Sequence, residues 1–128
     1  MKPIPISTTE FIERVKNDEI LILDFWASWC GPCRAFAPIF EAAAARHPDI
    51  TWGKVDTEAE QELAAALDIR SIPTLMVFRQ GVLLLAQAGL VPAAALDEIV
   101  ARVRAIDMDD VRQRIEKARG EEASPRPD

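Results

Sequence analysis

The feature that most constrains this chain is ILILDFWA at positions 20–27, a run that is apolar except for one aspartate. The run is too short for a typical helix and rich in isoleucine and aromatic residues, so it predicts a strand in the middle of a sheet. Such a strand needs covering elements on both faces of the sheet. Its single charged residue, Asp24, would then be buried, and burial without a partner raises the pKa of a carboxyl group.

Other segments show the spacing of helices or the alternation and turn signals of strands. Helices are predicted over 8–17, 34–46, 57–67 and 92–104, and strands over 50–55, 74–78 and 82–88. Capping boxes at Ser7–Glu10 and Thr57–Glu60 open the first and third of these helices. A strand–helix–strand unit implies a parallel pair with a right-handed crossover, while the tight turn at 79–81 implies an antiparallel hairpin. We therefore predict an α/β protein whose mixed β-sheet is flanked by helices on both faces.

The length of the chain limits the number of domains, and its net charge limits the kinds of partner. The 128 residues suffice for one domain, which we place at 1–104. It is followed by an extension at 105–128, with an extra C-terminal helix that ends at Gly120 and a disordered tail at 121–128. A net charge of −6 argues against nucleic acid or an anionic membrane as the main partner. No apolar run is long enough to span a membrane or resembles a secretory signal, so we expect a cytoplasmic protein.

The chain has two cysteines, Cys30 and Cys33, in C-x-x-C spacing, and a single histidine, His47. These three side chains cannot complete a four-ligand zinc site within one chain, and two cysteines are too few for a disulfide-stapled secreted scaffold. The spacing alone leaves three alternatives, which are a redox pair, half of an intermolecular metal site, or two incidental thiols.

The position of the cysteine pair favours redox chemistry. The pair lies where the central strand passes into a helix, and a thiolate just ahead of a helix N-terminus is stabilised by the partial positive charge and free N–H groups there. Pro32 suits a first helical position because its missing N–H would be unpaired anyway, and Gly31 allows close backbone approach. We therefore predict Cys30 as the exposed nucleophile of thiol–disulfide exchange and Cys33 as the more buried, resolving thiol.

With these residues in place, the chain resembles a known family. ILDFWASWCGPC (22–33) is similar to the active-site segment of the thioredoxins, and RSIPTLMVF (70–78) is similar to the family's proline segment. The resemblance covers residues 5–103 and implies the thioredoxin fold, with the C-terminal helix as an addition. CRAFAPIFE and DTEAEQELAAALDIRSIPT resemble the thioredoxin-2 branch. The N-terminal zinc-binding segment of that branch has no counterpart here, so no metal is expected.

The resemblance also implies roles for residues outside the cysteine pair. Asp24 would be the base that deprotonates Cys33, with Lys54 of the neighbouring strand as its ion-pair partner. The bond between Ile72 and Pro73 would be cis and would face the cysteines, which leaves the Ile72 backbone to pair with an extended substrate segment.

The same resemblance defines the surroundings of the nucleophile. Trp29 completes the active-site motif together with Gly31 and Pro32. Trp29 and Gly89 would form an apolar rim on which a substrate rests. His47, at the predicted end of a helix, is expected to cap the helix or to lie on the surface and is given no catalytic role.

On this resemblance the chain is a general protein-disulfide reductase that uses no cofactor beyond the redox-active disulfide of Cys30 and Cys33. Its substrates would be disulfide-containing proteins, and thioredoxin reductase would return the chain to its dithiol form. We expect the chain to be a monomer. The alternative is a thioredoxin-fold binding module or chaperone that uses the apolar rim around Trp29, with redox activity secondary.

Overall fold

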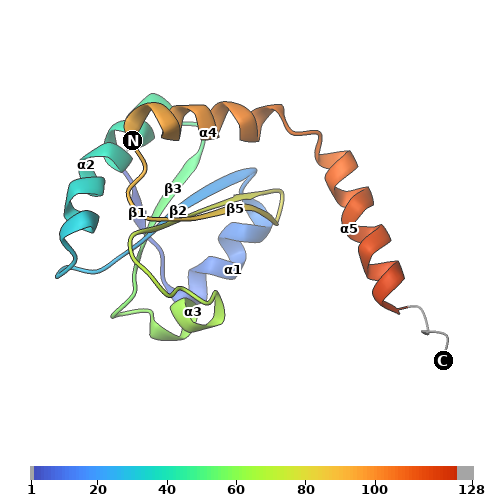
Figure 1. Cartoon of the computed structure of the whole chain (residues 1–128), viewed down its shortest axis with the longest axis horizontal. Helices are drawn as coiled ribbons and strands as arrows, with labels where there is room; N and C mark the ends of the chain where they lie inside the picture. Colours follow the sequence, from blue (N-terminus) through green and yellow to red (C-terminus); the bar gives the residue numbers. More distant parts are fainter. Residues whose placement is uncertain (1, 124–128) are drawn as a thin grey trace.

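The computed structural model describes residues 2–123 and contains a mixed five-stranded sheet in the order β1-β3-β2-β4-β5. The strands are β1 (Ile4–Pro5), β2 (Ile20–Trp26), β3 (Thr51–Asp56), β4 (Thr74–Arg79) and β5 (Val82–Ala88). The helices are α1 (Thr8–Asn17), α2 (Gly31–Arg46), α3 (Gln61–Ala66), α4 (Ala93–Ala105) and α5 (Met108–Ala123). Figure 1 shows α2 and α4 on one side of the sheet and α1 and α3 on the other, as predicted, while α5 extends away from this body.

β2 is the central strand that its apolar run predicts. It pairs in parallel with β3 and antiparallel with β4, and all its residues from Ile20 to Phe25 are buried. β1 was not predicted, because two residues, one of them a proline, show no alternation. It exists because Ile4 pairs with Gly53 at the outer side of β3.

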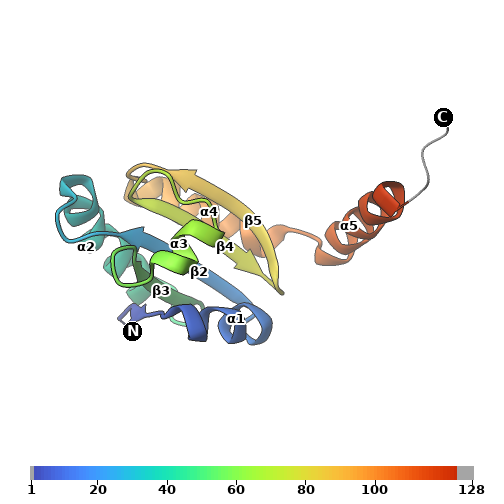
Figure 2. The same ribbon diagram turned by 90° about the horizontal axis from the view of Figure 1, so that it is seen from below.

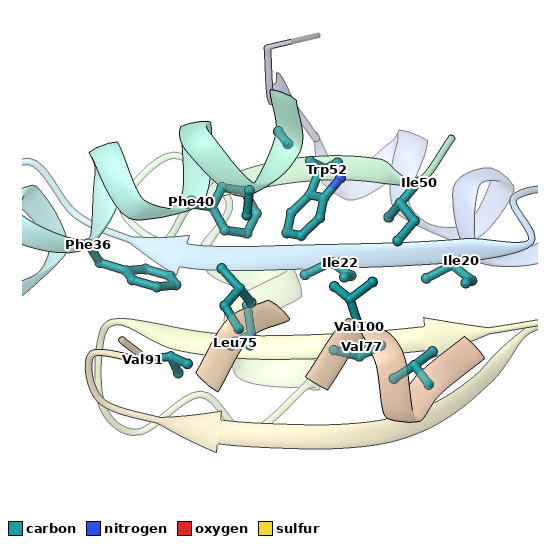
Figure 3. Close-up of a cluster of buried hydrophobic side chains, with 14 residues drawn as sticks. Ile20, Ile22, Phe36, Phe40, Ile50, Trp52, Leu75, Val77, Val91 and Val100 are labelled. Atoms are coloured by element: carbon teal, nitrogen blue, oxygen red, sulfur yellow. The ribbon is translucent and has the colours of Figure 1, made fainter. Parts of the chain in front are cut away.

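The sheet separates two hydrophobic cores. Figure 3 shows the core between the sheet and helices α2 and α4, which includes Phe36 of α2, Ile22 of β2 and Val100 of α4. The other core, under α1 and α3, contains Phe25 and the remaining odd-numbered residues of β2. Because successive strand residues point to opposite faces, Asp24 lies on the same face as Ile22, the face that α2 covers.

The turn after β3 differs from the prediction. α3 begins at Gln61 with Glu60 as its N-cap, and no side chain caps it, so the predicted capping box at Thr57–Glu60 is wrong. The Thr57 hydroxyl instead donates to the backbone oxygen of Trp26 at 3.0 Å. This long-range bond holds the turn against the end of β2, and it outweighs the local capping preference.

The hairpin between β4 and β5 closes at the predicted turn. Gln80 and Gly81 have φ values of 51° and 79°, the left-handed geometry of a two-residue hairpin loop. β5 then carries a β-bulge, since Phe78 pairs with Leu83 while Val77 pairs with Leu85, which leaves Leu84 as the extra residue.

The C-terminal helix is longer than predicted. α5 runs through Gly120 to Ala123, so the predicted helix end at Gly120 is wrong. A glycine inside a helix costs only about 1 kcal/mol relative to alanine, and the good helix formers on either side of it offset that cost. Residues 121–123 of the predicted tail therefore belong to α5, and residues 124–128 lie outside the described residues.

Candidate active site

Cys30 and Cys33 form a disulfide at the junction of β2 and α2, with their Cα atoms 5.2 Å apart. Cys30 is the N-cap of α2, and its Sγ accepts the backbone N–H of Cys33 at 3.2 Å. The first N–H groups of a helix have no partner within the helix, so a sulfur in this position takes the place of a capping oxygen. A negative charge on the Cys30 sulfur would be stabilised by the same donor and by the helix dipole.

The predicted contrast in exposure between the two cysteines is wrong for this disulfide form. Cys30 is 4% exposed and Cys33 is 3% exposed. Both are covered because Trp26 and Ile72 pack against the pair. The cysteines differ in their contacts instead, since the Cys30 sulfur lies at the N-cap and 3.7 Å from the backbone oxygen of Ile72. Ile72 therefore borders the Cys30 sulfur.

Asp24 is the buried acid of the site. The side chain is 0% exposed, and neither carboxylate oxygen has a hydrogen-bond partner among the described residues. Loss of hydration on burial raises the pKa of Asp24 to about 6, and the positive charge of Lys54 opposes part of that shift. The sequence predicted both the burial and the direction of the pKa shift.

Lys54 is placed differently from the expected ion pair. It is the register partner of Asp24 on β3, but no salt bridge joins the two within residues 2–123. Its Nζ lies over the ring of Trp26, 5.0 Å from the ring centroid, in a cation–π contact. Lys54 therefore acts on Asp24 through its charge at a distance. The contact with Trp26 was not predicted, although the two residues lie on neighbouring strands, two positions apart in register and on the same face of the sheet.

The proline loop faces the disulfide as the resemblance implies. The Ile72–Pro73 bond is cis. The backbone N–H of Gly89 donates to the Pro73 oxygen at 2.8 Å, and Gly89 has a φ of 91°, which favours glycine. The loop after β5 is thereby held beside the proline loop.

An exposed apolar rim flanks the disulfide. Trp29 is 67% exposed, directly before Cys30, and Leu90, which follows Gly89, is also exposed. Leu90 was not singled out from the sequence, although its place next to Gly89 was a signal. Arg34 was also missed, and its guanidinium donates to the backbone oxygen of Ser28 at 2.9 Å, which ties α2 to the loop before the cysteines.

Metal sites and membrane-spanning helices are both absent from the described part of the chain. Within the described part of the chain, no group of three or more His, Cys, Asp and Glu side chains is placed to hold a metal ion. No helix formed by residues 2–123 is long and apolar enough to cross a membrane.

The geometry of the disulfide defines the class of protein. A disulfide that caps a helix at the end of a central strand is the site of a thiol–disulfide oxidoreductase. The family model described as thioredoxin matches residues 2–104, and the chain therefore belongs to the thioredoxin family.

Individual relatives agree with this assignment. The chain is 46% identical over 112 residues to a putative thioredoxin 2 of Streptomyces coelicolor, an alignment that covers 88% of this chain and 84% of that relative. A mutant thioredoxin from Halobacterium salinarum is similar in structure, with a TM-score of 0.76 at 29% identity over 83% of this chain and 94% of that one. Oxidised thioredoxin from Plasmodium falciparum gives a TM-score of 0.72 at 30% identity, covering 82% of this chain and 100% of that one.

Membership of the family and the geometry together establish the chemistry. The chain is a disulfide oxidoreductase that acts by dithiol–disulfide exchange through Cys30 and Cys33. The relative named thioredoxin 2 agrees with the resemblance to that branch.

Proposed function

We propose that the chain is a general protein-disulfide reductase, with Cys30 as nucleophile and Cys33 as resolving thiol. The observation that carries the proposal is the position of the Cys30 sulfur at the N-cap of α2, where it accepts the Cys33 N–H. The thiolate is the attacking species in disulfide exchange, so the sulfur whose negative charge the helix stabilises attacks first.

Two exchange steps complete one turnover. The Cys30 thiolate attacks one sulfur of the substrate disulfide, which forms a mixed disulfide and releases the other substrate sulfur as a thiolate. The Cys33 thiolate then attacks the Cys30 sulfur, which closes the Cys30–Cys33 disulfide and releases the second substrate thiol. Two electrons pass to the substrate, the released thiolates take up protons, and the chain ends in its disulfide form.

Asp24 is proposed as the base that takes the proton of Cys33. Its pKa of about 6 lies close to neutral pH, which suits a group that accepts and releases a proton in each turnover. It also lies on the face of the sheet that α2 covers, and α2 carries Cys33. Lys54 supports this role by keeping the pKa of Asp24 from rising further.

The substrate would lie on the surface formed by Trp29, Ile72, Pro73 and Gly89. Gly31 and Pro32 form the exposed turn between the two cysteines and leave room for a polypeptide to approach. We assign the redox machinery to residues 1–104 and an accessory role to the extension at 105–128.

The proposed partners follow from the same chemistry. Disulfide-containing proteins are the substrates, and a thioredoxin reductase returns the chain to the dithiol form. The Gly-Pro insert places no cation or imidazole between the cysteines, which suits a reductant of a reducing compartment such as the cytoplasm. We propose that the chain acts there as a monomer.

Reduction of insulin tests this function. With dithiothreitol as electron source, the chain should accelerate the precipitation of the insulin B chain. A thioredoxin reductase with NADPH should replace dithiothreitol. Activity with dithiothreitol but not with thioredoxin reductase would support the disulfide reductase activity of the chain and exclude thioredoxin reductase as its electron donor. No activity with either donor would contradict the proposed function.

The exposed apolar rim favours a second candidate, a binding module or chaperone whose redox activity is secondary. Trp29, directly before Cys30, and Leu90, directly after Gly89, are both exposed, as a docking surface for unfolded polypeptide requires. A double variant, Cys30→Ser with Cys33→Ser, separates the candidates. Suppression of aggregation of an unfolded protein that survives in this variant would support the binding module.

A further inference from the structure

A groove of about 350 Å³ lies beside the proline loop, on the face of the sheet that carries α3. Most of its lining is apolar, with Ile69 on the loop after α3, Met76 on β4, and Leu83 and Ala86 on β5. Leu83 is 45% exposed, so its side chain is open to solvent along the groove. Figure 2 shows α3 over the sheet and β5 along its edge. The groove is lined by the segment that follows α3 and by side chains of β4 and β5.

The groove shares a wall with the redox centre. Ser71 and Thr74 line the groove, and Ile72 and Pro73 lie between them in the chain. Ile72 packs against the disulfide, and its backbone oxygen is 3.7 Å from the Cys30 sulfur. The Thr74 hydroxyl donates to the Ser71 oxygen at 2.5 Å, which holds this short turn together. A polypeptide that reaches Cys30 along Ile72 therefore enters the groove within a few residues, since an extended chain advances about 3.3 Å per residue.

The β-bulge at Leu84 creates the apolar wall of this groove. Without the bulge, strict alternation along β5 would place Leu83 on the opposite face from Ala86. With the extra residue, Leu83 pairs with Phe78 and Ala86 pairs with Met76, and all four side chains share the face toward α3. Bulges beside active sites commonly re-aim a side chain in this way.

The outer edge of β5 is open as well. β5 is the last strand in the order of the sheet and pairs only with β4 among the described residues. Its sequence, VLLLAQA, contains no charged residue and no proline, two of the devices that prevent an edge strand from pairing, and the bulge at Leu84 is the one such device that it carries. An extended segment lying in the groove would rest on the small side chains of Ala86 and Ala88.

We propose that this groove is a specificity subsite, which receives an apolar side chain from the extended segment that flanks the attacked cysteine of a protein substrate. The inference rests on the proposed disulfide reductase function. Continuity with the redox centre selects the substrate as the occupant, because the turn at 71–74 lines the groove on one side and contacts the Cys30 sulfur through Ile72 on the other. The apolar lining selects the kind of side chain.

Disulfide-linked peptide dimers test the subsite on the full chain. One cysteine-containing peptide has serine at every neighbouring position, and four others carry a single leucine two or three residues before or after the cysteine. We expect a kcat/KM at least about fivefold higher for one of the leucine peptides, because the groove covers part of one aliphatic side chain. Equal rates for all five would overturn the subsite and leave the proposed function intact. Reduction of none of them would reject both.

Variants assign the preference to the groove. Ala86→Phe fills the groove, and Leu83→Ser removes its wall without adding bulk. In each variant, kcat/KM for the preferred leucine peptide should fall close to kcat/KM for the serine peptide. Ala101→Phe, at an exposed alanine of α4 on the other face of the sheet, is the matched control and should keep the wild-type ratio. If Ala86→Phe fails to fold, Leu83→Ser decides alone.

Two results would overturn the assignment. The first is a preference for leucine that persists in a folded groove variant. The second is a concentration-dependent dimer, seen in analytical ultracentrifugation, that the Leu83→Ser substitution dissociates. That result would show that a second copy of the chain occupies the groove.

Discussion

The last two helices have similar lengths but opposite relations to the body of the protein. α4 buries Leu96, Val100 and Val103 against the sheet, whereas on α5 the buried residue is Met108 at its start. The half-buried residues further along α5 are Val111 and Ile115, which form a stripe only one side chain wide. A narrow stripe buries too little apolar area to hold a helix against a sheet, so α5 leaves the body.

The attachment of α5 is confined to its base. The Arg79 guanidinium donates to the backbone oxygens of Val103 and Ile106 at 2.8 Å each, and Arg112 of α5 contacts Gln80. Arg79 pairs with Ile20 at the start of β2, while the cysteines follow the other end of that strand. The extension is therefore anchored at the end of the sheet away from the redox centre, and this separation makes the two regions testable independently.

The largest expected effect lies in the body. Cys30→Ser should reduce insulin reduction to background, because the attacking thiolate is lost. Cys33→Ser should accumulate mixed disulfides with substrate, detectable on non-reducing gels, since attack remains and resolution is lost. Equal trapping by the two variants would refute the assignment of Cys30 as nucleophile. No substitution on α5 should approach this effect.

Core packing should separate α4 from α5 in stability. Leu96→Ala is expected to lower the free energy of unfolding by about 3 kcal/mol, because it opens a cavity in a closed core. Ile115→Ala, at a half-buried site on α5, should lower it by less than about 1 kcal/mol. Urea denaturation monitored by tryptophan fluorescence measures both. A similar loss at the two sites would show that α5 packs on the body in solution.

Asp24 should give the body a pH dependence that α5 lacks. The folded chain keeps a proton on Asp24 up to about pH 6, whereas the unfolded chain releases it near 3.8, so stability falls as pH rises between these values. Asp24→Asn should therefore stabilise the chain by about 2–3 kcal/mol at pH 8 and by little at pH 3.5, at about 1.4 kcal/mol per pKa unit.

The matched control for this experiment is Asp110→Asn, on the exposed first turn of α5. It should lower stability by less than about 1 kcal/mol, because a negative charge near a helix N-terminus is favourable. Urea midpoints between pH 3.5 and pH 8 test the contrast. An Asp24→Asn variant whose stability follows the wild type at every pH would contradict the raised pKa.

The redox potential should respond to the turn between the cysteines and not to the extension. The chain is expected to have a potential of about −270 mV, the value typical of thioredoxins. Pro32→His should raise it by tens of millivolts, about 30 mV for each 1.4 kcal/mol by which the added imidazole stabilises the dithiol form. Equilibration with glutathione buffers measures both proteins. A wild-type potential above about −200 mV would contradict a reductase.

Removal of the extension should have the smallest effect on activity. Truncation after Arg104 is expected to leave insulin reduction unchanged and to cost about 1–2 kcal/mol, since the buried Met108 and the Ile106 contact of Arg79 are lost. Thermal unfolding and the insulin assay check the two parts. A truncated chain that folds but reduces no insulin would place the extension in the reductase function.

Local sequence determined most of the architecture. The apolar run at 20–27 predicted the central strand, the turn at Gln80-Gly81 predicted the hairpin, and the cysteine pair was predicted at the start of a helix. These features depend on periodicity, caps and turn geometry, which act between residues close in sequence. For the same reason the burial of Asp24 could be predicted, because the apolar residues on both sides of it describe its surroundings.

Tertiary structure decided how the parts of the site meet. Lys54 lies over Trp26 instead of bonding to Asp24, the two cysteines are almost equally covered, and a bulge turns Leu83 toward α3. Each outcome depends on contacts between strands or loops that are distant in sequence. A shift of one residue in strand register, or an aromatic ring contributed by a neighbouring strand, is enough to change these contacts. Sequence patterns describe which face a residue prefers, but the partner on that face is chosen only when the elements pack.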